Sequence, residues 1–185
     1  ILSLVRSAGI KWLCLGIESG NKEIRLEVAK GKFEDVDVEQ IVKQVHDSGI
    51  EIMANYIYGL PGDSVDTINK TYELSKKLNT LGWNTYAAMP LPGSALYKDA
   101  LSKNYKMPIK YEDFSFHSYN TQPLPTEHLK PAEILKLRDE NFIKYHTNEV
   151  FLKKIEKKFG NKAKNNILEM SKIKLKRKII EELEN

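Results

Sequence analysis

Residues 49–63 read GIEIMANYIYGLPGD, and this run says more about the fold than any other part of the chain. Between Gly49 and Gly59 it is rich in β-branched and aromatic residues, which favour strands. A glycine at each end, and a proline soon after the second one, are typical of turns. We therefore predict a strand over residues 50–58 that is closed by the turn Gly59-Leu60-Pro61-Gly62.

The segments on either side of this run continue an alternation of strand-like and helix-like patterns. The upstream helix has capping-box spacing between Asp37 and Gln40, and Gly49 is placed to end it. Strands that alternate with helices at this spacing indicate βαβ units and a parallel sheet, so the fold class is α/β. The expected elements are buried strands over residues 12–17 and 83–89, and helices over residues 37–48, 64–78 and 94–101.

Three parts of the chain differ in pattern. Residues 1–103 hold the strands and their helices, and residues 104–130 form a long irregular stretch that is both aromatic and polar. Loops of this length are usually lids or disordered, and the aromatic content favours packing. Residues 131–185 read as a helical extension in which Pro131 lies just inside a helix start and a last long helix begins near Asn161.

Composition sets limits on the class of protein. The 185 residues are 41% hydrophobic and 29% charged, with a net charge of +4, which fits a globular protein and predicts no nucleic-acid binding. No apolar run is long enough to cross a membrane, and a single cysteine is typical of a reducing compartment, so we expect a cytoplasmic protein. The chain opens at Ile1 in the middle of a helical pattern, which we interpret as a fragment whose partner is the upstream half of the same polypeptide.

Five motifs occur in a fixed order along the first hundred residues. Together they resemble the second half of the radical S-adenosylmethionine (radical SAM) barrel, in the subfamily that often carries a cobalamin-binding domain. The resemblance covers residues 1 to about 100 well and extends to the tail from Tyr111 to Lys178. The motifs are GIESGN at residues 16–21, Gly31, Gly49-Ile50, YGLPGDS at residues 58–64 and PLPGSALY at residues 90–97.

The resemblance implies a fold and an activity. The fold is the last three strands of a TIM-like (βα) barrel followed by an α-helical extension. The activity of the full-length enzyme is reductive cleavage of S-adenosylmethionine by a 4Fe–4S cluster, leading to cobalamin-dependent methyl transfer or another radical modification of an unknown substrate. The C-x-x-x-C-x-x-C motif that binds the cluster is absent, because Cys14 is the single cysteine. We expect Cys14 to be a small buried hydrophobic residue, and the fragment alone to be inactive.

The resemblance also assigns residues to S-adenosylmethionine. Glu18, with Ser19 beside it, faces the bound cofactor, Lys30 meets its carboxylate, Asn55 contacts the ribose and Ile57 packs on the adenine. Family members can carry aspartate where this chain has Asn55; asparagine keeps an acceptor for a ribose hydroxyl but lacks the charge. A lysine such as Lys30 can pair with a carboxylate as a point charge. Simpler interpretations stay open: Glu18 as a structural partner of a helix or of Lys30, Lys30 as a solvated surface residue, and the glycines as turn formers.

Other candidate residues lie outside the barrel motifs. His117 and Tyr119 in the irregular stretch could meet a substrate, although loop backbone satisfies such a histidine more often. No spacing of histidine, cysteine and aspartate suggests a metal site. The basic run Lys172–Lys178 predicts a solvated helical face, or else a patch for phosphates or lipid headgroups.

Two functions compete with radical chemistry. The strand-end glycines could bind a phosphorylated metabolite, or the basic tail and aromatic loop could form a non-catalytic interaction module.

Overall fold

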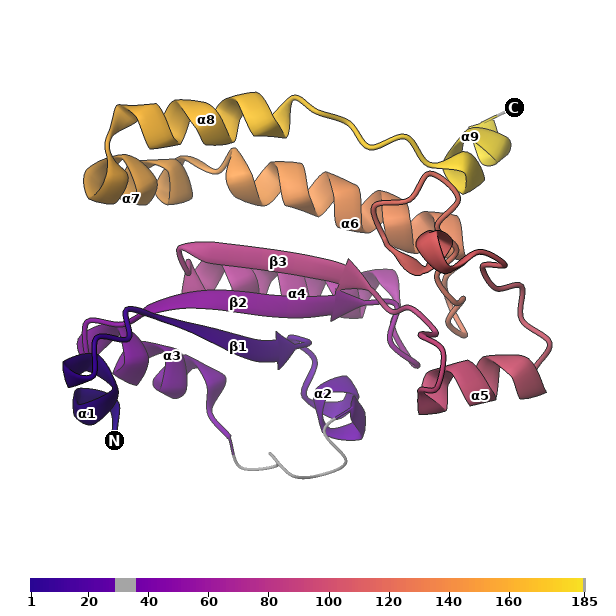
Figure 1. Ribbon diagram of the computed structural model, residues 1–185, viewed down its shortest axis with the longest axis horizontal. Coiled ribbons are helices and arrows are strands. Elements are labelled where there is room, and N and C mark those ends of the chain that lie inside the picture. The colour runs from indigo at the N-terminus through magenta and orange to yellow at the C-terminus, as the bar shows by residue number, and fades with distance from the viewer. Residues whose placement is uncertain (29–35, 185) are drawn as a thin grey trace.

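A computed structural model describes residues 1–28 and 36–184 (Figure 1). Three parallel strands, β1 (Trp12–Glu18), β2 (Glu51–Tyr58) and β3 (Gly82–Ala87), form one sheet in the order β1-β2-β3. The predicted α/β class and parallel sheet are therefore confirmed. The helices are α1 (Leu2–Ser7), α2 (Lys22–Val28), α3 (Val38–Asp47), α4 (Val65–Leu78), α5 (Ala95–Ser102), α6 (Pro131–His146), α7 (Glu149–Phe159), α8 (Asn161–Ser171) and α9 (Lys178–Glu184), with a 3₁₀ turn at Tyr111–Phe114.

The predicted helix starts are confirmed by their caps. The Asp37 carboxylate accepts a hydrogen bond of 3.0 Å from the Gln40 backbone N–H at the start of α3. At the start of α4, Ser64 and Thr67 exchange side-chain and backbone hydrogen bonds in a capping box. Such caps satisfy backbone donors that have no partner within the helix, so short polar side chains fix where each helix begins.

One face of the sheet forms the core. Ile52, Tyr56 and Trp83 lie on this face and are almost fully buried against α3, α4, α6 and α7. The Trp83 ring stacks on Tyr145 of α6, with ring centroids 5.0 Å apart and an angle of 16° between the planes. This packing attaches the helical extension to the sheet through apolar contact, the main stabilising force in such layers.

The opposite face of the sheet is open. On it lie alternate residues of the strands, among them Cys14 of β1, Asn55 of β2 and Tyr86 of β3, all of them partly or largely exposed. The prediction of a buried strand over residues 12–17 holds for Ile17, which is 3% exposed, but the prediction that Cys14 is a buried hydrophobic residue is wrong. Cys14 is exposed because its side chain lies on the open face, and β1 also has no strand on its outer side in the part of the chain that the structure describes.

The C-terminal third differs from the prediction in two places. A separate helix, α7, lies between α6 and α8, and Figure 1 shows α8 running alongside α6. The expected basic helix over residues 172–178 is wrong: α8 ends at Ser171, and residues 172–177 cross to α9 without helical structure. The physical reason is that the Arg177 side chain is held in a buried ion pair with Asp139.

The turn after β2 is held by one carboxylate. Asp63 Oδ2 accepts hydrogen bonds from the backbone N–H groups of Gly59 and Leu60, at 3.0 and 3.1 Å, and Oδ1 accepts one of 2.7 Å from the Thr67 hydroxyl. Gly59 and Gly62 both have positive φ, and a side chain at Gly59 would collide with Ile134 of α6. Burial raises the pKa of Asp63 against these hydrogen bonds, which lower it. The turn glycines therefore serve backbone geometry and packing.

Replacing Asp63 tests how much this turn contributes to stability. We expect Asp63→Ala to lower the free energy of unfolding by about 2–4 kcal/mol, because two buried backbone donors and a hydroxyl lose their acceptor. Urea denaturation followed by circular dichroism measures this loss. The matched control is Asp66→Ala on α4, whose carboxylate pairs with Lys70 at the surface and should change stability far less. Equal losses for the two variants would contradict the role given to Asp63.

Candidate functional site

The open face of the sheet gathers polar side chains near the carboxyl ends of its strands. The register aligns Gly16, Asn55 and Asn84 across the sheet, and Ile57 with Tyr86 one step further along. Residues that are aligned in a parallel sheet point to the same face. Two of the predicted residues, Asn55 and Ile57, are therefore brought together here with two that the sequence did not indicate, Asn84 and Tyr86.

Glu18 folds back over this face from the end of β1. Its backbone has φ +64°, and a Cβ built on Gly16 would lie 2.3 Å from Glu18 Oε1. The carboxylate thus occupies the space above Gly16, the position aligned with Asn55. It makes no hydrogen bond or ion pair with any residue that the structure describes, and burial raises its pKa. A half-buried, unpaired acceptor beside Asn55 can receive a hydrogen bond from a ligand.

Asn55 and Asn84 form a side-chain pair in the middle of the open face. Asn84 Nδ2 donates to Asn55 Oδ1 at 3.2 Å, while Asn55 Nδ2 donates to the carbonyl oxygens of Leu15 and Met53 at 3.3 and 3.2 Å. The Asn55 amide is therefore largely used within the protein, and Asn84 Oδ1 accepts no hydrogen bond from the described residues. Asn84 presents the freer acceptor of the two, and the pair fixes its orientation.

Ser19 is a correction to the predicted site. Its side chain has no exposed surface, and its hydroxyl lies 3.3 Å from the Thr71 hydroxyl of α4 and accepts from the Asn21 N–H at 3.1 Å. The next residue, Gly20, donates its N–H to Thr71 at 2.9 Å, and a Cβ there would lie 2.6 Å from the Lys70 carbonyl oxygen. Ser19 and Gly20 hold the end of β1 against α4, so Ser19 cannot touch a ligand.

Of the two remaining residues assigned to the cofactor, Ile57 and Lys30, only Ile57 lies in the described part of the chain. Ile57 is partly buried on the open face and packs with Ile24, Leu60 and Ala88, which gives this end of the site an apolar wall. Lys30, predicted to meet a carboxylate, lies outside the described residues.

A pocket of about 410 Å³ follows the outer edge of β1. Residues 14–18 of the strand line one side, and apolar residues of α3 and the segment before it, such as Val36 and Ile41, line the other. Arg25 of α2 also lines it: one guanidinium nitrogen donates to the Ser19 carbonyl at 2.9 Å, but its buried Nε has no partner in the structure. The pocket is mostly apolar, and among the described residues that line it the Arg25 Nε lacks an acceptor.

The irregular segment 104–130 reaches the open face through one aromatic contact. The Phe116 ring meets Tyr86 of β3 edge to face, with centroids 5.3 Å apart, and the His117 ring lies against Phe116 at 3.9 Å. A second attachment comes from Thr121, whose buried hydroxyl donates to the Met89 sulfur at 3.9 Å. Apart from the 3₁₀ turn at Tyr111–Phe114, residues 104–130 contain no helix or strand, and Phe116 is the aromatic residue that packs on the sheet end.

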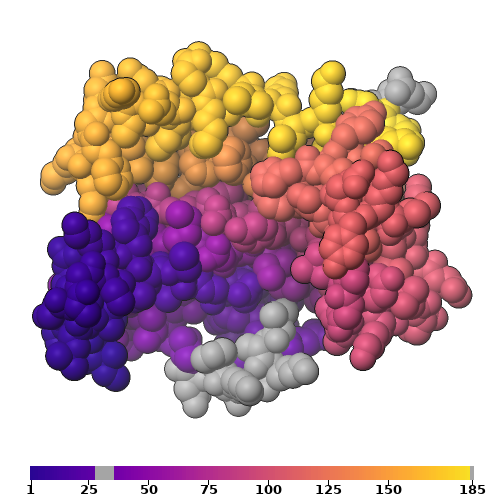
Figure 2. Space-filling view, in the orientation of Figure 1, coloured from indigo at the N-terminus to yellow at the C-terminus, as the bar shows by residue number. Residues whose placement is uncertain are grey.

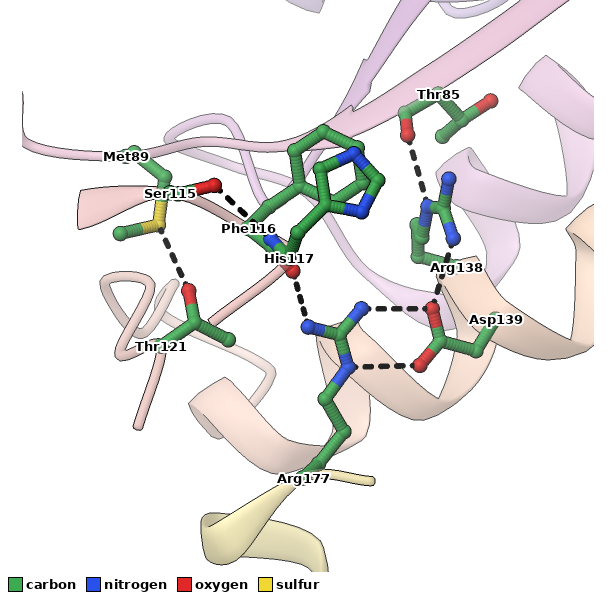
Figure 3. Close-up of polar contacts among 9 residues, drawn as sticks. All are labelled: Thr85, Met89, Ser115, Phe116, His117, Thr121, Arg138, Asp139 and Arg177. Carbon is green, nitrogen blue, oxygen red and sulfur yellow. Dashed lines mark hydrogen bonds and ion pairs between the residues drawn. The ribbon is translucent and has the colours of Figure 1, made fainter. Parts of the chain in front are cut away.

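A buried charge cluster holds Phe116 in place (Figure 3). Arg177, 2% exposed, donates from Nε and Nη2 to the two Asp139 oxygens at 3.0 and 3.1 Å, and its other terminal nitrogen donates to the Phe116 carbonyl. Arg138 donates to Asp139 and to the Thr85 carbonyl of β3, and its guanidinium lies 4.9 Å from the Phe116 ring. A buried bidentate pair of this kind fixes geometry because either charge left unpaired would be costly.

The two residues of segment 104–130 that were predicted to meet substrate have different surroundings. His117 lies beside Arg138 and Arg177, and partial desolvation together with these two positive charges lowers its pKa. The Tyr119 hydroxyl donates to Glu181 of α9 at 2.7 Å, and its carbonyl accepts from the Lys178 N–H at 3.0 Å. Tyr119 therefore belongs to the contact between the segment and the C-terminal helix.

The described residues include no group of three histidine, cysteine, aspartate or glutamate side chains placed to hold a metal ion. An iron–sulfur cluster of the implied type needs three thiolates, and the chain has one, Cys14. The chain therefore does not fit a cluster by itself.

No protein-family model matches this chain, and no curated protein matches it either. In the described part of the chain, no helix has the length and apolar character needed to cross a bilayer.

Two glycine substitutions test the placement of Glu18 and Ser19. We expect Gly20→Ala to destabilise the protein by about 1–3 kcal/mol, because the new methyl group would press on the backbone of α4. Gly16→Ala should leave the free energy of unfolding nearly unchanged, because the atom it meets is the flexible end of Glu18. Chemical denaturation measures both. The reverse order of stabilities would contradict the packing described here.

Arg177→Ala tests the charge cluster. We expect a loss of about 3–5 kcal/mol in stability, since Asp139 would be left partly buried with one fewer cation. Amide hydrogen exchange should become faster at residues 113–121, which Arg177 and Tyr119 hold. The control is Lys176→Ala, the exposed neighbour, for which we expect no change in exchange. Unchanged protection of residues 113–121 in Arg177→Ala would show that the cluster does not hold the segment.

Proposed function

We propose that this chain provides the last three βα units of a radical SAM barrel and binds S-adenosylmethionine on the open face of its sheet. One observation carries the proposal: Glu18, Asn55 and Ile57, assigned to the cofactor through the motif resemblance, occur side by side on an open sheet face near the strand carboxyl ends. Barrel enzymes place their active sites at that end. A face whose central residues are amides, with an apolar residue beyond them, suits a nucleoside.

Each residue has a part in binding. The Asn84 amide oxygen accepts from a ribose hydroxyl, with Asn55 orienting it through their hydrogen bond. Ile57 offers an apolar surface to the adenine ring, and the Glu18 carboxylate accepts from a second hydroxyl or from the amino group of the cofactor. When a cluster is bound elsewhere in the enzyme, it supplies the electron for radical chemistry; this chain contributes binding and orientation.

The outer edge of β1 is the place where further strands of the barrel would join. Edge strands expose unpaired backbone donors and acceptors, and proteins normally cover or pair them. Here the exposed edge is lined by an apolar pocket, and a backbone carbonyl of an added segment would satisfy the unpartnered Arg25 Nε. The upstream half of the polypeptide is the proposed occupant.

The turn geometry disfavours the alternative in which the glycine turn binds a phosphorylated metabolite. A phosphate at such a turn is held by backbone N–H groups. The N–H groups of Gly59 and Leu60 already donate to the Asp63 carboxylate, which would also repel a phosphate.

The proposal requires a C-x-x-x-C-x-x-C sequence encoded upstream of Ile1, and sequencing of the gene tests this first. In the cluster-loaded protein, we expect Asn84→Ala to raise the dissociation constant for S-adenosylmethionine about tenfold, the value of one buried hydrogen bond. Calorimetry measures it, and exposed Asn165→Ala on α8 is the control. An upstream region without the cysteines, or an unchanged affinity in Asn84→Ala, would contradict the proposal.

A further inference from the structure

Residues 172–176 form a short strap between two anchored points. Ser171, at the end of α8, is buried and bonds to the Ile167 carbonyl, and Arg177 is buried in the pair with Asp139. All five residues between them are exposed. Figure 1 shows this strap crossing from α8 to α9 along the edge of the molecule farthest from α1 and β1. We use "basic strap" for residues 172–176 from here on.

The basic strap exposes two large aliphatic side chains to solvent. Its sequence, KIKLK, alternates lysine with large aliphatic residues. Ile173 is 70% exposed and Leu175 is 38% exposed, and Met170 at the end of α8 is also exposed nearby. A cluster of exposed aliphatic residues held between two fixed ends is typical of a contact surface.

Two of the three lysines of the basic strap have no charged partner among the described residues. Lys172 pairs with Glu169, but Lys174 and Lys176 make no ion pair or hydrogen bond with any residue in the described part of the chain. Residues 170–180 contain no aspartate or glutamate. The partner that complements this surface is therefore negatively charged and also accepts aliphatic side chains.

We propose that the basic strap is a docking site for an anionic phospholipid surface. Lysines beside such a surface are attracted to its headgroups, while adjacent aliphatic side chains enter the boundary with the acyl chains. A nucleic acid fits less well, because the strap offers no aromatic ring for base stacking and its neighbouring arginine, Arg177, is buried. In Figure 2 the yellow C-terminal segment lies at the upper right of the molecule and the indigo N-terminal region at the lower left.

Vesicle co-sedimentation of the whole chain tests this proposal, which is independent of radical chemistry. We expect binding to phosphatidylcholine vesicles that contain phosphatidylglycerol and no binding to phosphatidylcholine alone. Lys174→Glu with Lys176→Glu should lower the partition coefficient by about 30-fold or more, because each lysine near an anionic surface contributes roughly a factor of five. Ile173→Ser with Leu175→Ser should lower it roughly tenfold through loss of apolar burial.

The control variant carries Lys22→Glu with Lys98→Glu, which makes the same change in net charge on α2 and α5. It should bind vesicles nearly as well as the unaltered chain, and circular dichroism checks that all variants are folded. Equal loss in the control, or no loss in either strap variant, would overturn the proposal. Binding to an RNA oligonucleotide without vesicle binding would overturn it in favour of a nucleic-acid surface.

Discussion

Ile52, Tyr56 and Trp83 lie on one face of the sheet, and their burial beneath α3, α4 and α6 holds the strands together. Parallel sheets are normally covered on both faces, because crossover helices and neighbouring elements bury their backbone and side chains. In the described residues only one face has this cover. The polar residues of the candidate site and the exposed cysteine lie on the other face. The proposed function depends on this one-sided burial.

Local signals in the sequence were sufficient to predict most of the elements. Capping residues such as Asp37 and Ser64 act within one turn of the chain, so their pattern can be read without knowledge of the fold. The strand over residues 50–58 was predictable for the same reason. Helices α2 and α7 were not predicted, although the Asn148 side chain caps the first turn of α7 and so marks its start.

The site itself could be predicted only in part. Glu18, Asn55 and Ile57 were named from motifs, and the register then placed them on one face. Asn84 was missed because its importance comes from alignment with Asn55 across strands, although period-two alternation in β3 could have indicated its face. Ser19 was misassigned because its contact with Thr71 joins residues distant in sequence. Arg177 appeared as one charge in a basic run, yet its partner Asp139 lies on another helix.

Arg177 links the charge cluster to the basic strap, because it belongs to the cluster and directly follows the strap in sequence. The buried Arg177 side chain bonds to Asp139 and to the Phe116 carbonyl, and this holds Phe116 against Tyr86. The same contacts anchor the C-terminal end of residues 172–176. Those residues then cross the surface with their side chains outward. The aromatic segment thus faces the sheet, whereas the basic strap faces solvent.

Chemical labelling of Cys14 tests most directly whether the open face becomes the interior of a larger barrel. Cys14 is the single cysteine of this chain and lies exposed on the open face of β1. Its alkylation by iodoacetamide can be followed by peptide mass spectrometry, in this chain and in the polypeptide extended upstream of Ile1. We expect rapid labelling in this chain and strong protection in the extended protein, where barrel strands would enclose the open face. Equal labelling rates in the two proteins would contradict it.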